Sequence, residues 1–193
     1  MSYTFFGVQV VVTAFYKDTL RSRLHDLIAS ASERQSLQQK RAFWKKVTAL
    51  LNEAMPVFEM GYWDLVRGRK AESEFESWTS EIEGSLATEQ EEMGSATDES
   101  IRLSADKKHV LCTLIVLLAQ GSNSDLTLGE RCDVPKEQWW TRQTFARLIA
   151  SFPLLNFANV EADAVYLVPG SDRDGLSMED LHGGGYEYLH PLG

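Results

Sequence analysis

Three stretches of the chain carry the hydrophobic pattern of β-strands. The most apolar, residues 110–119, contains no charged side chain and is followed at once by turn-forming residues. Its β-branched residues favour a strand buried on both faces, and a helix of this length would rise only about 15 Å, against a membrane core of about 30 Å. Residues 5–16, with alternating valines, and residues 159–168 predict two more strands. We expect residues 110–119 to form the centre of the sheet.

Four other segments repeat apolar residues with the period of an amphipathic helix. The first opens near Asp18, the second spans residues 37–55, and the third spans residues 70–93. The fourth begins at Asp133, an N-cap residue followed by Pro135, and ends near residue 151. Residues 58–66 are interpreted as a short helix or turn, and residues 120–135 as a long connecting loop.

The order of these elements is strand, three helices, strand, helix, strand and short helix. It predicts one α+β domain over residues 1–193, with a small sheet of about three strands covered by helices on at least one face. If one helix joins the second and third strands as neighbours, these strands should be parallel. Residues 94–106 are predicted to be a mobile loop, because they carry few apolar side chains. Residues 186–193 follow three glycines and are expected to form a flexible C-terminal tail.

The net charge of −9 is distributed unevenly along the chain. Residues 1–70 hold 11 basic and 6 acidic side chains, whereas residues 71–101 hold 10 acidic and no basic ones. The whole protein should therefore repel polyanions, but its first third need not. Cys112 and Cys132 form no disulfide framework, and the N-terminus lacks the features of a signal peptide. A cytoplasmic protein with reduced thiols and no transmembrane segment is expected.

Two groups of residues are candidates for contacting a partner. Basic side chains cluster off the apolar stripe of the second helix and at the corner after residue 66; they are Lys40, Arg41, Lys45, Lys46, Arg67, Arg69 and Lys70. Such a cluster is typical of a solvated helix face, but with Trp44 among the lysines it could also bind nucleic acid or an anionic surface. Trp139 and Trp140 are adjacent, so they cannot face the same way on a helix, and one of them could be an exposed anchor for a protein partner.

Motifs with catalytic or metal-binding potential are incomplete. Residues 182–185 match an esterase oxyanion motif but lack its nucleophile elbow, and residues 172–175 resemble a calcium loop without its first and last carboxylates. His109 and Cys112 would point to opposite faces of a strand and could not hold one ion together. A cysteine nucleophile paired with a histidine could be revealed only by folding. We therefore predict no catalytic residues, no metal ligands and no cofactor.

The C-terminal half resembles an uncharacterised family found in cyanobacteria, plastids and some other bacteria. The resemblance covers about residues 109–192 and depends on the apolar strand around residues 113–116, a strand that closes on Pro169, the acidic turn at residues 174–181 and the ending at residues 189–192. The family pattern has tryptophan where this chain has Leu167. The resemblance implies a domain of unknown function and no catalytic residues, and the separate hydrophobic segment of many members is absent from this sequence.

The interpretation that follows is a non-enzymatic module for protein binding or assembly. Its basis is segregated charge, clustered aromatic residues and the incomplete catalytic motifs. The partner is expected to be another protein, and association between copies of the chain is a further expectation. Binding of nucleic acid or an anionic surface through the basic helix face is the alternative, and an enzyme with an unrecognised site is a third hypothesis.

Overall fold

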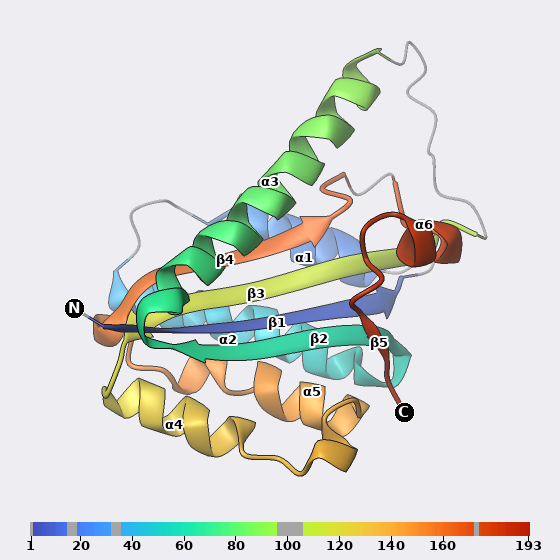
Figure 1. Cartoon of the computed structure of the whole chain (residues 1–193). Coiled ribbons are helices and arrows are strands. Elements are labelled where there is room, and N and C mark those ends of the chain that lie inside the picture. The colour runs from blue at the N-terminus through green and yellow to red at the C-terminus, as the bar shows by residue number, and fades with distance from the viewer. Residues whose placement is uncertain (1, 15–18, 32–35, 96–105, 172–173) are drawn as a thin grey trace.

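The protein is built around one antiparallel sheet of five strands. The computed structural model describes residues 2–14, 19–31, 36–95, 106–171 and 174–193. The strand order is β4-β3-β1-β2-β5 (Figure 1). The strands are β1 (Tyr3–Thr13), β2 (Phe58–Arg67), β3 (His109–Ala119), β4 (Val160–Val168) and β5 (His190–Pro191). The α+β class is confirmed, whereas the expectation of about three strands is wrong.

The two most apolar strands lie side by side in the interior of the sheet. The run predicted to be a buried strand is β3, and its residues from His109 to Leu118 are buried. The central position belongs to β1, which pairs with β3 along its whole length from Tyr3 to Thr13. Each of β1 and β3 has a strand on either side, and both faces of the sheet carry helices. These two strands are therefore buried on all sides and contain few polar residues.

One face of the sheet is covered by four helices, of which two lie behind the strands and two below β2 in Figure 1. They are α1 (Thr19–Ala29), α2 (Leu37–Glu53), α4 (Asn123–Cys132) and α5 (Arg142–Ile149). Even-numbered residues of β1, such as Phe6 and Val8, pack there in one cluster with Trp44 of α2 and Phe145 of α5. We call this side the back face.

The opposite, front face is covered by α3 (Ala71–Ser95) and the short helix α6 (Met178–Gly183) (Figure 1). The predicted apolar stripe of α3 contacts the sheet, with Phe5 and Ile115 packed against Phe75 and Trp78. In α6, Ser177 and Asp180 form the predicted capping box. No helix in the described part of the chain is long and apolar enough to cross a membrane.

Two strands were missed by the sequence pattern. Residues 58–66, interpreted as a helix or turn, form most of β2, which pairs with β1 from Thr4↔Arg67 to Val12↔Phe58. The expected flexible tail contains β5, and Leu189 and Leu192 on either side of it are buried. Strand formation depends on packing against neighbours more than on local preference, which explains both errors.

The connection between β3 and β4 also differs from the prediction. Residues 120–135 are not a loop: Ser122 caps α4 by accepting a hydrogen bond from the Asp125 N–H (3.3 Å). The next helix, α5, begins at Arg142 after Thr141 as N-cap and not at Asp133. Two helices, α4 and α5, therefore connect β3 to β4 in place of one. β4 starts at the end of the sheet where β3 stops and runs antiparallel to it, not parallel as predicted. The loop predicted at residues 94–106 falls mostly on residues 96–105, outside the described residues.

Candidate functional site

The outer edge of β2 is only partly covered. In an antiparallel sheet, every second residue of a strand directs its N–H and its C=O to the neighbouring strand on one side, and the residues between direct theirs to the other side. The Leu192 N–H donates to the Glu59 carbonyl (2.9 Å), and Gly61 pairs with His190 of β5. Alternation places the backbone groups of Trp63, Leu65 and Arg67 on the same outer edge. Beyond Gly61, no strand in the described parts of the chain pairs with this edge.

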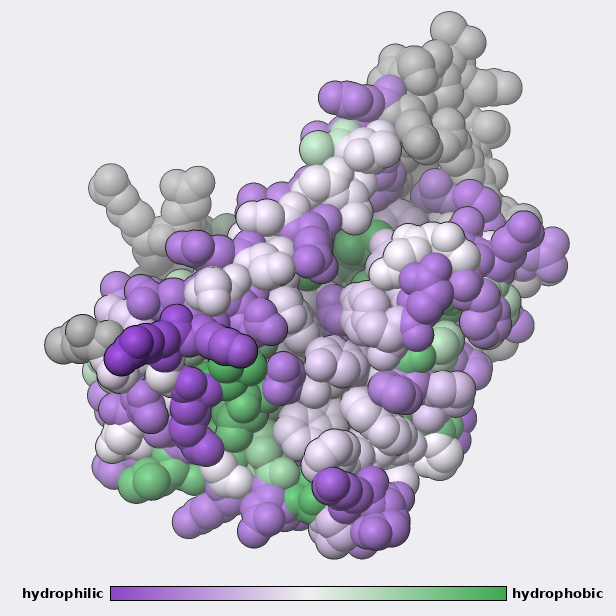
Figure 2. Space-filling view, in the orientation of Figure 1, coloured by the Kyte–Doolittle hydropathy of each residue, from purple (hydrophilic) through white to green (hydrophobic). Residues whose placement is uncertain are grey.

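A groove of 590 Å³ runs between this edge and α4, which we call the β2 groove. It is lined by Trp63, Asp64, Leu65, Arg67, Gly129, Glu130, Cys132 and Asp133. In the space-filling view, apolar side chains gather over the C-terminal half of β2 and continue toward α4 (Figure 2). A strand edge with a hydrophobic strip beside it is a surface that proteins usually protect.

Arg67 and Asp125 close one end of the groove and hold α4 against β2. The Arg67 Nε donates to Asp125 Oδ1 (2.8 Å), and the same buried carboxylate accepts hydrogen bonds from the Gly121 N–H (2.8 Å) and the Thr4 hydroxyl (3.1 Å). Burial alone would raise the pKa of Asp125, but these donors together lower it. Gly129 permits the close approach, since a Cβ there would lie 2.8 Å from the Arg67 guanidinium.

Asp64 covers a donor on the open edge. Its Oδ1 accepts the N–H of Leu65 at 2.8 Å, so the carboxylate occupies the position that a neighbouring strand would fill with a carbonyl. Burial raises the pKa of Asp64, and the Leu65 N–H partly offsets this effect by favouring the charged form. Asp64 and Glu74 of α3 also raise the pKa of Tyr62, after burial as the main cause. The front side of the edge is therefore acidic.

An aromatic cluster forms the other end of the groove. The Trp63 indole N–H donates to the Trp139 carbonyl (3.3 Å), and the Trp139 indole N–H donates to Val134 (2.9 Å). Trp140 stacks on the imidazole of His190 at 3.9 Å. Trp139 and Trp140 lie in the turn before α5 and not on the predicted helix. Their rings meet at 90° and both residues are half-buried, so neither stands free in solvent.

The predicted basic residues are divided between two surfaces. Arg67 lies at the β2 groove and Arg69 follows β2 in an exposed turn. Lys40 of α2 pairs instead with Asp163 of β4, which β3 and β1 separate from β2. Arg41, Lys45 and Lys46 are exposed on α2, the helix that also carries the half-buried Lys40.

Trp44, considered for stacking on nucleic acid, is fully buried. It stacks on Phe152 at 4.6 Å, and its indole N–H donates to Asp163 (2.9 Å). Trp44 lies next to the lysines in the sequence, but its side chain anchors α2 in the core and cannot stack on a nucleic-acid base.

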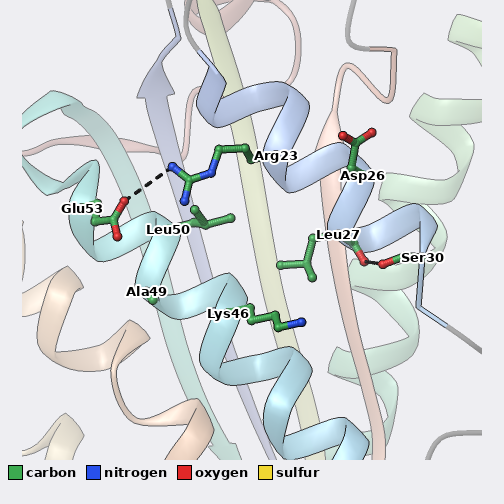
Figure 3. A pocket seen from close by; sticks show the side chains of 8 residues that line it. All are labelled: Arg23, Asp26, Leu27, Ser30, Lys46, Ala49, Leu50 and Glu53. Atoms are coloured by element: carbon green, nitrogen blue, oxygen red, sulfur yellow. Dashed lines mark hydrogen bonds and ion pairs between the residues drawn. The ribbon is translucent and has the colours of Figure 1, made fainter.

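Two further hollows lie on the back layer. One, of 590 Å³, separates α1 from α2; Leu27 and Leu50 lie between the helices, and Arg23 and Glu53 approach to 3.7 Å across them (Figure 3). A smaller one, of 240 Å³, includes Leu37 and Leu154, which are about half exposed. The first carries both signs of charge on its rim, and no convergent set of polar groups lies in either.

Burial or hydrogen bonding affects Cys112, Cys132, His109 and Ser177. Burial raises the pKa of Cys112 and of Cys132 to about 12. Burial also lowers the pKa of His109, whose Nδ1 lies 3.2 Å from the Leu176 carbonyl. Ser177 is engaged in the cap of α6. Among the described residues, no three His, Cys, Asp or Glu side chains are grouped to hold a metal ion.

The β2 edge was not predicted from the sequence, although Arg67 and both tryptophans lie near it. Residues 58–66 are rich in residues that favour strands and lie between Pro56 and Gly68, which was the available signal. No family model, curated protein or solved structure matches the chain. The fold and the groove define an α+β protein with an accessible sheet edge, and the family resemblance stays a prediction.

Proposed function

We propose that this protein is a non-enzymatic binding module that captures an extended segment of another polypeptide as an added strand on β2. The observation that carries the proposal is the open edge at Trp63, Leu65 and Arg67, which lies beside a groove of 590 Å³. Unpaired strand edges are templates for another chain, and several families of peptide-binding domains use them in this way.

The chain already adds a strand to this edge. Its C-terminal segment pairs with β2 at Met60 and Gly61, and Leu192 continues the pairing to Glu59. The remaining edge, from Trp63 to Arg67, extends about 14 Å at roughly 3.4 Å per residue, which is enough for a segment of about five residues. Backbone hydrogen bonds would supply affinity, and side-chain contacts in the groove would supply specificity.

The lining of the groove supports a polypeptide more than a polyanion. Asp64, Glu130 and Asp133 line it, and Arg67, the cation among the described lining residues, is paired with Asp125. A phosphate backbone would be repelled by these carboxylates. The exposed basic side chains of α2 do not line the β2 groove. The burial of Trp44 removes the aromatic contact that favoured nucleic acid.

The test is a pair of substitutions at one residue of the open edge. Proline is tolerated on an edge strand at a position whose N–H does not pair with the neighbouring strand. The Leu65 N–H donates to the Asp64 carboxylate and not to β1, so Leu65→Pro should leave the β1–β2 pairing intact while blocking an added strand. Leu65→Ala is the matched control, because it shortens the same side chain but keeps the N–H.

Linear peptides selected from a displayed random library against the wild-type protein would be titrated against both variants by calorimetry. We expect Leu65→Pro to bind at least about tenfold more weakly than Leu65→Ala, a difference of about 1.4 kcal/mol that is comparable to one backbone hydrogen bond. Amide hydrogen exchange should slow at Trp63, Leu65 and Arg67 in the complex. Equal binding by the two folded variants, protection confined to another surface, or a library that yields no binder would refute the proposal.

A further inference from the structure

The two sides of the open edge differ in chemistry. Side chains of β2 alternate between the faces of the sheet: Trp63 and Leu65 pack toward the back cluster, whereas Tyr62 belongs to a front cluster. Asp64 shares the front side with Tyr62, because successive side chains of a strand point to opposite faces. A strand added to this edge would alternate in the same way.

The back side of an added strand would meet apolar surface. It would lie next to Leu65 and Trp63 and opposite Cys132 of α4, all of which line the β2 groove. The thiol of Cys132 behaves as a small apolar group, because its pKa of about 12 keeps it protonated at neutral pH. Aliphatic side chains fit this side.

The front side would meet negative charge. Asp64 lies between Trp63 and Leu65 on the open edge, and Glu74 of α3 and Asp64 both act on the nearby Tyr62 hydroxyl. Residues directly opposite each other on paired strands interact, favourably for unlike charges and unfavourably for like charges. A lysine or arginine opposite Asp64 would therefore be preferred to a glutamate.

From these contacts we infer that the β2 groove selects extended segments in which aliphatic residues alternate with polar ones and a basic residue stands opposite Asp64. On binding, the partner's backbone carbonyl takes the Leu65 N–H, and the Asp64 carboxylate that held it moves to the partner's basic side chain. This inference rests on the proposed function, but it can fail separately, because strand addition by itself does not require a basic residue.

Three acetylated and amidated peptides test the selection. The first is Thr-Val-Thr-Val-Lys-Val-Thr-Val-Thr. In the second, the central lysine is replaced by glutamate. The third, Val-Val-Thr-Thr-Lys-Thr-Thr-Val-Val, has the composition of the first without its alternation. Each would be titrated against the wild-type protein and Asp64→Asn, with Glu161→Gln on the opposite edge strand β4 as a control that removes an equal charge.

We expect the wild-type protein and Glu161→Gln to bind the first peptide at least about tenfold more tightly than the second. The reason is that lysine opposite Asp64 forms a favourable cross-strand pair, whereas glutamate there forms an unfavourable one. Asp64→Asn should reduce that ratio to less than about threefold while still preferring the first peptide to the third. Asparagine keeps an acceptor for the Leu65 N–H, so the folded edge is preserved.

Several results would overturn the inference. If library-selected peptides bind through Leu65 but the lysine and glutamate peptides bind equally, the charge selection is wrong and the proposed function stands. If the ratio is unchanged in Asp64→Asn, Asp64 is not the selecting group. Self-association of the protein that Leu65→Pro abolishes would place a second copy on the edge in place of a basic segment. If no library peptide binds, both proposals fail.

Discussion

Asp125 should be among the most costly polar residues to remove, because its carboxylate joins β1, β2 and the start of α4. It is 4% exposed and accepts hydrogen bonds from Arg67, Gly121 and Thr4. Replacing Asp125 with alanine leaves the Thr4 hydroxyl and the Gly121 N–H without this acceptor. Each buried donor that loses its acceptor lowers the free energy of unfolding by about 1–3 kcal/mol. The Arg67 side chain is 42% exposed and can turn to water, so its lost ion pair adds little.

The expected result is a loss of about 3 kcal/mol in the free energy of unfolding, measured by urea denaturation monitored by tryptophan fluorescence. For a chain of this size, that corresponds to a fall in Tm of about 6–12 °C. Asp133→Ala, which removes an exposed carboxylate from the same groove, is the control and should change stability by less than about 0.5 kcal/mol. A loss below about 1 kcal/mol in Asp125→Ala would show that these contacts do not hold α4 in place.

The same carboxylate contributes to pH dependence. The pKa of Asp125 is lower in the folded protein than in the unfolded chain, so the charged form stabilises the fold. That stability is fully present above the unfolded value of about 3.9 and is lost as the pH falls through the folded pKa. Asp125→Asn should therefore destabilise the protein at pH 7 and show a smaller further loss on acidification below about pH 4. A variant with the same acid sensitivity as the wild type would contradict this assignment.

Three other outcomes are expected. Ile115→Asp should abolish cooperative unfolding, because it places an unpaired charge in the centre of the sheet; a soluble variant with a sharp thermal transition would be inconsistent with the observed core. Trp44→Phe should lower the free energy of unfolding by about 2 kcal/mol, because the hydrogen bond to Asp163 and part of the ring volume are lost. An unchanged midpoint of urea denaturation would argue against that contact. Cys112 and Cys132 should resist iodoacetamide at pH 8 in the native state and react in urea, as followed by mass spectrometry, because burial raises both pKa values to about 12; rapid native alkylation would show that the thiols are accessible.

Part of the candidate site could be recognised in the sequence. The adjacent tryptophans and the basic residue Arg67 were identified from residue type and position. Arg67 lines the β2 groove, and Trp139 packs against Trp63, which also lines it. The middle of the groove was not identified, because Asp64 and Leu65 matter only through an edge that pairing creates. The cluster Lys40 to Lys46 looked like one binding face, but Lys40 pairs with a carboxylate from a strand more than a hundred residues later in the chain.

The sequence by itself determined the elements whose burial follows a local pattern. The apolar runs of β1 and β3, the stripe of α3 and the cap of α6 at Ser177 each depend on residues within a few positions of one another. Only the tertiary structure decided that residues 58–67 pair with β1, that β4 runs antiparallel to β3, and that the edge at Trp63, Leu65 and Arg67 is open. The physical reason is that a strand obtains its hydrogen bonds from a partner distant in sequence, so both its existence and its unpaired edge depend on contacts that no local periodicity records.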